Sequence, residues 1–112
     1  LDNLWFGVTV TCAAERKRIE ILRRNVKAKH YHVTFEPLSD GVGEVDFSGI
    51  GWTVIGTETG NCKGKIPTKK EWADNLHIQA KERGVPVFMK EALEGIMPAD
   101  EMIQEFPKEF GI

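Results

Sequence analysis

The sequence predicts an α/β fold made of parallel β-α-β units, about half of a TIM-like (β/α) barrel. Apolar segments of strand length alternate with segments whose apolar residues recur at helical spacing, which is typical of a parallel sheet with right-handed crossovers. A complete barrel usually needs about 250 residues. The 112 residues therefore correspond to a single α/β domain over residues 1–112, which we expect to be the C-terminal portion of a longer protein.

The first β-α-β unit is predicted from the N-terminal third of the chain. Residues 4–10 (LWFGVTV) are rich in β-branched and aromatic side chains, which favours a strand. Residues 13–29 predict a helix, because apolar side chains recur among charged ones at three- and four-residue spacing. Residues 31–35 predict the second strand, which ends before Pro37 because proline cannot donate to a strand ladder.

The second unit follows a connector over residues 39–51 that is rich in glycine and aspartate. Residues 52–56 predict a third strand whose two faces are both covered, since apolar and small side chains occupy both parities. Residues 85–89 predict the fourth strand, and residues 98–104 predict a short terminal helix.

The helix between the third and fourth strands has marked ends. Thr68 and Glu71 have the spacing of a capping box, in which each side chain satisfies an exposed amide of the first turn. Every fourth residue from Trp72 to Ala80 is apolar, and Gly84 suits the position just past the helix end.

Composition and charge exclude several classes of protein. The formal net charge of −2 does not favour nucleic acid as a partner, and the longest apolar runs are too short to span a bilayer. The N-terminal residues do not resemble a signal peptide, so we expect a cytoplasmic protein. Cys12 and Cys62 form no disulfide framework and are expected to be free thiols in a reducing compartment.

Half a barrel would leave two unpaired strand edges and an uncovered sheet face. The chain also has no initiator methionine and enters a strand pattern within its first few residues. We therefore expect a partner: either a missing N-terminal half of the same protein or self-association through the exposed sheet edges.

Polar residues follow each predicted strand, where binding groups gather in parallel α/β sheets. Glu36, Glu58 and Lys90 are the candidate catalytic residues, since two carboxylates and a lysine at one end of the sheet could perform acid–base chemistry. They could instead hold the amine and carboxylate of a substrate. The sequence leaves open a third interpretation, in which each carboxylate caps a loop or pairs with a neighbouring lysine.

Two other kinds of site are excluded. A phosphate-binding loop is excluded because Lys65 is followed by Ile66 and Pro67 instead of leading directly into a helix. A zinc site formed by His32 and Glu36 is excluded because four strand residues at about 3.3 Å each separate them by about 13 Å. We therefore predict no metal site in this chain.

Six segments of the sequence together resemble an uncharacterised bacterial and bacteriophage family. In chain order they are LWFGVTV, HVTFEPL, WTVIGTETGNCKGKIP, EWADNL, GVPVFMKEAL and IQEFPKEF. The chain resembles the C-terminal half of the phage gene-product thirty-seven / sixty-eight family, a domain of unknown function with a radical-SAM-like barrel. The resemblance covers nearly the whole chain, and the combination of F-E-P-L with I-G-x-E-T-G is fairly specific.

The resemblance implies a [4Fe–4S] cluster on three cysteines of an upstream half, with S-adenosylmethionine as the cofactor of the full-length protein. Cys12 and Cys62 cannot supply three ligands, so we expect this chain alone to bind no cofactor and to be inactive alone. The resemblance also implies that later strands contact S-adenosylmethionine. In this sequence the corresponding positions are Val54, Gly56, Glu58 and Asn61.

Two functions follow from these observations. The first is the C-terminal half of a radical-SAM-like barrel that contributes cofactor or substrate contacts at the strand C-terminal ends. The second is a non-catalytic phage or prophage accessory module that uses the same scaffold only for binding.

Overall fold

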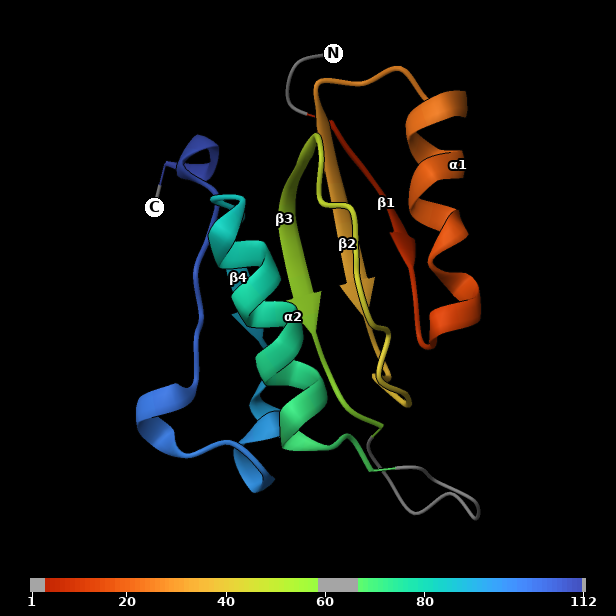
Figure 1. Ribbon diagram of the computed structural model, residues 1–112. Coiled ribbons are helices and arrows are strands. Elements are labelled where there is room, and N and C mark those ends of the chain that lie inside the picture. Colours follow the sequence, from red (N-terminus) through yellow and green to blue (C-terminus); the bar gives the residue numbers. More distant parts are fainter. Residues whose placement is uncertain (1–3, 59–66, 112) are drawn as a thin grey trace.

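A computed structural model describes residues 4–58 and 67–111 of the chain. Within them, four strands and two α-helices follow one another in this order (Figure 1): β1 (Trp5–Thr9), α1 (Lys17–Asn25), β2 (His30–Phe35), β3 (Ile50–Ile55), α2 (Lys70–Glu82) and β4 (Val87–Met89). Short 3-10 helices flank them: η1 (Ala13–Glu15), η2 (Glu91–Gly95), η3 (Ala99–Glu101) and η4 (Lys108–Phe110). The predicted α/β class is confirmed.

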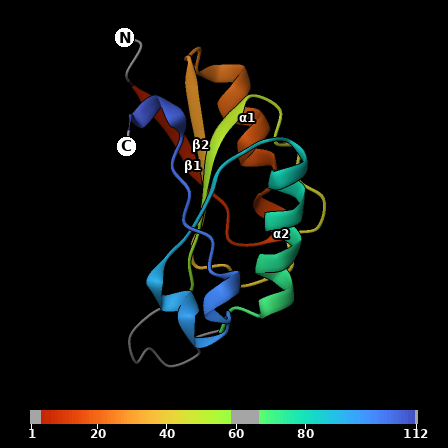
Figure 2. The same ribbon diagram turned by 90° about the vertical axis from the view of Figure 1, so that its left-hand side faces the viewer.

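The strands lie in chain order, β1-β2-β3-β4, and each neighbouring pair is parallel, as the sequence predicts. Both helices cover the same face of the sheet, which Figure 2 shows edge-on. Register shifts once, between Tyr31 and His32, where β3 carries Gly51 as an extra residue opposite β2. We call the side that α1 and α2 leave uncovered the open face.

The hydrophobic core lies between the sheet and its helices. Val33 and Phe35 of β2 and Ile55 of β3 are fully buried there, as is Leu76 of α2. Their burial follows from the period of two along each strand, which sends alternate side chains to the helix side. The sheet is therefore anchored through one of its two faces.

The connector between β2 and β3 replaces the helix that a regular β-α-β unit would place there. It has no regular secondary structure, yet Val42, Val45 and Phe47 are buried in the core. The Phe47 ring packs edge-on against Phe35, with 6.4 Å between ring centroids. An extended segment thus does the covering that a helix does for the other crossovers.

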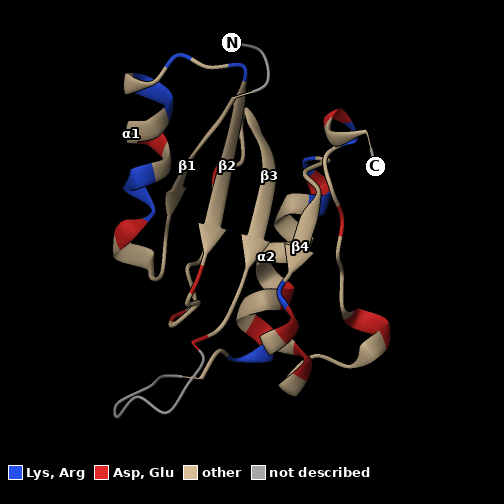
Figure 3. Cartoon of the chain, turned by 180° about the vertical axis from the view of Figure 1, so that it is seen from behind, with Lys and Arg blue, Asp and Glu red and all other residues tan. Residues whose placement is uncertain are grey.

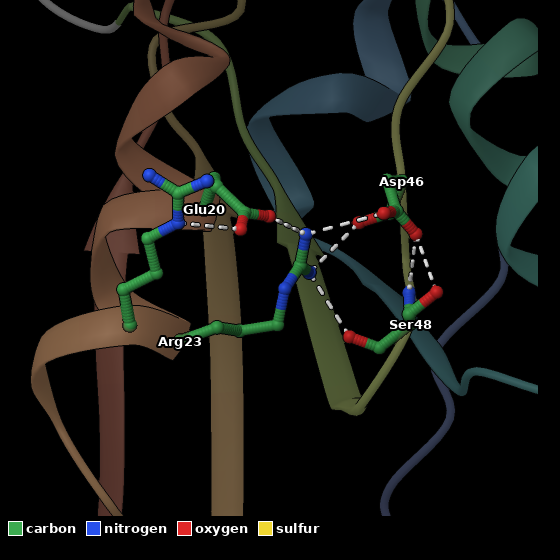
Figure 4. Close-up of polar contacts among 5 residues, drawn as sticks. Glu20, Arg23, Asp46 and Ser48 are labelled. Atoms are coloured by element: carbon green, nitrogen blue, oxygen red, sulfur yellow. Dashed lines mark hydrogen bonds and ion pairs between the residues drawn. The ribbon is translucent and has the colours of Figure 1, made fainter.

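Side chains of both helices hold the connector by its backbone. Arg23 of α1 donates through Nη1 to the carbonyl oxygens of Asp46 (3.0 Å) and Ser48 (2.9 Å), and its Nη2 lies 3.3 Å from the Asp46 carboxylate. Figure 4 shows Arg23 between Glu20 and these connector residues. From the other side, Gln79 of α2 donates to the Gly43 carbonyl (2.8 Å).

The Asp46 carboxylate is itself fixed within the connector. It accepts hydrogen bonds from the hydroxyl and the amide of Ser48, at 2.5 and 3.0 Å. These bonds, together with the nearby Arg23 charge, hold the pKa of Asp46 below its usual value. The carboxylate therefore stays charged beside Arg23 at neutral pH.

The outer edge of β4 is paired by the chain's own C-terminal segment. The Met89 amide donates to the Ile103 carbonyl (2.8 Å), and the Glu105 amide donates to the Val87 carbonyl (2.8 Å). The remaining outward groups bind side chains, since the Val87 amide donates to Glu105 Oε1 (3.0 Å) and Gln104 Nε2 donates to the Met89 carbonyl (3.0 Å). The expectation of two unpaired edges is therefore wrong for β4.

The predicted N-terminal helix is shorter than expected. Regular α-helix covers only Lys17–Asn25, and Val26 already has an extended backbone. The hydroxyl of Tyr31 donates to the Val26 carbonyl, which satisfies the end of the helix from the next strand. The predicted helix over residues 98–104 shrinks to the three residues of η3, because the residues after it pair with β4.

The predicted capping box at the start of α2 is wrong. Lys69 is the N-cap residue and makes no side-chain capping bond. The buried Thr68 hydroxyl donates instead to the Leu38 carbonyl (2.6 Å), which ties the helix start to the connector. At the other end, Gly84 has a positive φ of 69°, which confirms its predicted place past the helix end.

No helix in the described part of the chain is long and apolar enough to cross a membrane.

The clamp on the connector predicts unequal roles for two neighbouring arginines. Arg23→Gln should lower the free energy of unfolding by about 2 kcal/mol, because it removes two charge-assisted hydrogen bonds from a side chain that is 18% exposed. Arg24→Gln is the control: that side chain is 75% exposed and pairs with Glu20 on the surface, so the loss should stay below about 0.5 kcal/mol. Urea denaturation measures both, and equal losses would contradict this role of Arg23.

Candidate functional site

Glu36 and Lys90 form an ion pair across the C-terminal ends of three strands. Glu36 follows β2, Lys90 follows β4, and the end of β3 lies between them. The Lys90 ammonium lies 2.7 Å from Glu36 Oε1, although the two residues are 54 positions apart in the sequence. The lysine side chain is 48% exposed and the glutamate side chain 32% exposed, so solvent reaches both groups. Of the predicted catalytic residues, these two come together.

Gly56 makes this contact possible. It directly follows β3, and a Cβ built on it would lie 2.8 Å from Glu36 Oε2 and 2.9 Å from Glu36 Cδ. Gly56 does not have a positive φ, so the glycine is required by the space that the Glu36 side chain takes and not by its backbone conformation. Its backbone also bonds to the end of β2 and the residues after it, donating to the Phe35 carbonyl and accepting from the Leu38 amide, each at 2.9 Å.

The remaining predicted residues are placed differently. Glu58 lies beyond β3 and is half-buried, but no ion pair joins it to another described residue. Val54 is 8% exposed and stands in register with Thr34 and Phe88 on the open face. Asn61 lies outside the described residues. The structure therefore brings Glu36, Gly56 and Lys90 together, and Val54 lies two residues before Gly56, within β3.

The polar residues after β1 serve the local fold. The Thr11 amide and hydroxyl both donate to Glu15 Oε1, each at 2.7 Å. These hydrogen bonds, the hydroxyl bond foremost, lower the pKa of Glu15. The half-buried Cys12 precedes η1, and Ser39 of the connector donates to the Thr11 carbonyl through both its amide and its hydroxyl. This end of the sheet is thus occupied by a capped turn.

An aromatic cluster on the open face was missed by the sequence reasoning. Trp52 packs against Phe88, Phe106 and Phe110, at centroid distances of 6.2, 6.0 and 5.3 Å. Phe110 also meets Trp5 edge-on at 5.3 Å, and the Trp52 indole donates to the Glu105 carbonyl (2.9 Å). The C-terminal segment therefore covers part of the open face as well as the β4 edge. The motif F-P-x-x-F near the end of the chain was its only sequence signal.

His32 lies on the open face next to Trp52 of the aromatic cluster. It stands in register between Gly7 and Trp52, and its ring lies across Gly7, where a Cβ would be 2.1 Å from Cε1. Burial lowers the pKa of His32 below its ordinary value of 6.5, since the charged imidazolium loses hydration. His32 is therefore mostly neutral at physiological pH.

Acidic side chains gather on the 3-10 helices that follow β4, as Figure 3 shows. Lys70 bridges this region to α2: its ammonium lies 2.7 Å from Asp74 Oδ2 and 2.9 Å from Glu101 Oε2. The hydrogen bond with Asp74, and to a smaller extent the one with Glu101, raises the pKa of Lys70. The described residues include no group of His, Cys, Asp and Glu suited to hold a metal ion.

Three shallow depressions on the described surface lie away from Glu36 and Lys90. Two border the connector: one is shared with α2 and includes Asn75 and Gln79, and the other is shared with α1 and includes Arg16 and Arg23. The third lies beside Pro86 and Phe106. None of these three depressions has Glu36 or Lys90 among its lining residues.

The comparisons with known proteins give one family. The family model described as a protein of unknown function (DUF5131) matches residues 1–111. No curated protein and no solved structure matches the chain.

His32 gives the unfolding free energy a defined pH dependence. Its folded-state pKa is depressed, so its contribution to stability is complete above pH 6.5 and is lost as pH falls toward the folded-state pKa. Replacing the imidazole in His32→Gln should flatten this part of the stability profile. The control is His77→Gln, since His77 is a half-buried residue of α2. This variant should keep the pH dependence of the wild type. Thermal unfolding across this pH range measures the difference, and parallel profiles for wild type and His32→Gln would refute it.

The role of Gly56 predicts a specific loss. Gly56→Ala should displace the Glu36 carboxylate and separate it from Lys90, because the added methyl group needs the same space. The nitrogen-15 resonance of the Lys90 ammonium should then move as it does in Glu36→Gln. Gly95→Ala is the matched control, since no atom lies within 4 Å of its Cβ position. An unchanged Lys90 resonance in Gly56→Ala would show that the carboxylate does not depend on this glycine.

Proposed function

The chain belongs to the DUF5131 family of proteins of unknown function, and we propose that it is the ligand-binding C-terminal part of a radical-SAM-like half-barrel. In this proposal the Glu36–Lys90 pair is the binding element. It holds a small zwitterionic molecule, one that carries an ammonium group and a carboxylate. We also place the protein in the cytoplasm.

The order of the strands supports the half-barrel. Parallel strands that follow one another in space, with their helices on one face, coil in one direction as the strands of a (β/α) barrel do. A doubly wound sheet would instead place helices on both faces. The open face of this sheet would then form part of the barrel interior. An upstream half of a longer protein, or a second copy of the chain, would cover it.

The ion pair of Glu36 and Lys90 is the observation that carries the proposal. Lys90 is exposed and Glu36 is half-buried, and solvent-accessible ion pairs contribute about 1 kcal/mol or less, so exchanging one for a ligand costs little. A ligand carboxylate would replace Glu36 beside Lys90, and the ligand ammonium would replace Lys90 beside Glu36. Gly56, at the end of β3 between them, places no side chain beside the Glu36 carboxylate.

Of the two cofactors that the resemblance implies, S-adenosylmethionine suits the residues of this chain and the [4Fe–4S] cluster does not. The amino-acid end of S-adenosylmethionine carries the ammonium and carboxylate that Lys90 and Glu36 would bind. A [4Fe–4S] cluster needs more thiolate ligands than the two cysteines of this chain provide, and among its described residues no group could hold a metal ion. The cluster would have to be bound by another polypeptide segment, and no step of a reaction is assigned to this chain.

The exposure of the pair favours a second function. The Lys90 side chain is 48% exposed and the Glu36 side chain 32% exposed, so water reaches both groups, whereas catalytic sites commonly exclude water from the reacting groups. A non-catalytic binding module on the same scaffold would use the pair in the same way. The two functions differ in whether the bound ligand is converted.

Calorimetric titration with S-adenosylmethionine, and separately with methionine, tests the proposal. Both probes should bind, because both carry the zwitterionic group. Glu36→Gln and Lys90→Met should each weaken binding by about tenfold or more, equivalent to about 1.4 kcal/mol. Glu91→Gln, a neighbouring exposed carboxylate, is the control and should bind as the wild type does.

Either of two results would contradict the proposal: no binding of either probe, or equal binding by wild type, Glu36→Gln and Lys90→Met. Binding without conversion of the probe, once every other segment of the full-length protein is present, would favour the non-catalytic module.

A further inference from the structure

We propose that His32 is a second ligand-binding residue of the site at Glu36 and Lys90, and that the ligand is an amino acid extended by a polar group. The inference rests on the proposed function, because it concerns the far end of the molecule that these two residues hold. It depends on three observations: His32 and Glu36 lie on the same side of β2, a threonine lies between them, and the imidazole nitrogens have no partner in the described part of the chain.

The course of β2 brings His32 and Glu36 to the open face. Alternate side chains of a strand point to opposite sides, and Val33 and Phe35 are fully buried on the helix side, so His32 points to the open face. The Glu36 carboxylate lies there too, because a Cβ built on Gly56 toward the open face would come within 2.8 Å of its Oε2. Four residues at about 3.3 Å each put about 13 Å between the two backbone positions.

Threonine side chains line the open face over β1 and β2. Thr34 is half-buried between His32 and Glu36, and Thr9, its register partner on β1, is exposed. The part of the open face over β3 and β4 carries the aromatic cluster instead, in which the Phe88 ring packs against Phe106 with 5.3 Å between centroids. A ligand held at Glu36 therefore extends over β1 and β2, where hydroxyl groups meet it.

The His32 imidazole has hydrogen-bonding groups that a ligand can use. Its ring lies across Gly7 of β1, where a larger side chain would displace it. Among the described residues, none shares a hydrogen bond with either ring nitrogen, and burial lowers the pKa of His32, so the ring is neutral. A neutral imidazole presents one N–H donor and one nitrogen that accepts. Leaving these groups unpaired in a half-buried ring costs free energy, and a ligand with matching groups would remove that cost.

The separation between the two ends of the site defines the class of ligand. A distance of about 13 Å exceeds the length of any genetically encoded amino-acid side chain, so the ligand carries a further group beyond its zwitterionic end. An amino acid joined to a nucleoside is long enough, and its base offers both donors and acceptors to His32. S-adenosylmethionine belongs to this class. Methionine is too short and would contact only Glu36 and Lys90.

Calorimetric titration with S-adenosylmethionine and with methionine tests the inference, because both carry the zwitterionic group and only the first reaches His32. The wild type should bind S-adenosylmethionine at least about tenfold more tightly than methionine. In His32→Phe, which keeps a planar ring without nitrogens, this preference should fall to about twofold or less, while the affinity for methionine stays unchanged. His30→Phe is the matched control: His30 lies on the same face of β2, stacked on Trp5 with 4.5 Å between ring centroids, and this variant should keep the preference.

The ring nitrogens of His32 provide a second measurement that needs no variant. Their nitrogen-15 resonances should shift when S-adenosylmethionine is added and not when methionine is added. Near-ultraviolet circular dichroism of the tryptophans verifies that His32→Phe is folded. Equal affinity of the wild type for both probes, an undiminished preference in folded His32→Phe, or unshifted ring resonances would each overturn the inference and leave the site at Glu36 and Lys90 in place. Binding of neither probe would overturn the proposed function and this inference with it.

Discussion

The structure depends on the burial of one sheet face beneath elements that all return on the same side. Val33, Phe35 and Ile55 are fully buried there, and every crossover has to cover them. Two crossovers do so with α1 and α2, and the third does so with an extended connector held by Arg23 and Gln79. The consequence is an asymmetric sheet: its open face and its edges must be satisfied by other means, and the C-terminal segment supplies much of that covering.

The parts of the fold that obey local periodicity could be predicted from the sequence. LWFGVTV and VPVFM have strand composition, and Gly84 marks the end of α2, so strand order and helix placement followed from ordinary rules. The capping box failed because the Thr68 hydroxyl has a partner 30 residues away, the Leu38 carbonyl. The helix predicted over residues 98–104 was wrong for a similar reason. This segment pairs with β4 through its backbone, and such pairing leaves no helical or strand period in the sequence.

The candidate site was predictable in its residues and not in its geometry. Glu36 and Lys90 could be selected because charged residues follow parallel strands, and a shared sheet edge brings such residues near each other. That Glu36 lies across the end of β3 to reach Lys90 depends on Gly56, whose position opposite the carboxylate no single-sequence rule reveals. The spacing of His32 from Glu36 excludes a zinc site, but spacing does not reveal that the imidazole lies across Gly7 and beside Trp52 on the open face.

The absent side chain at Gly56 links three positions that are far apart in the gene. A larger residue at position 56 requires the Glu36 carboxylate to move or a shorter side chain to stand at position 36, and in either case Lys90 loses its partner. Natural variation within the family should therefore treat positions 36, 56 and 90 as one inherited unit. Members that keep the acid and the lysine would also keep the glycine, while members that lose one would be free to lose all three. The contact between these side chains can therefore be tested by comparing the residues at positions 36, 56 and 90 among family members, without any further structure.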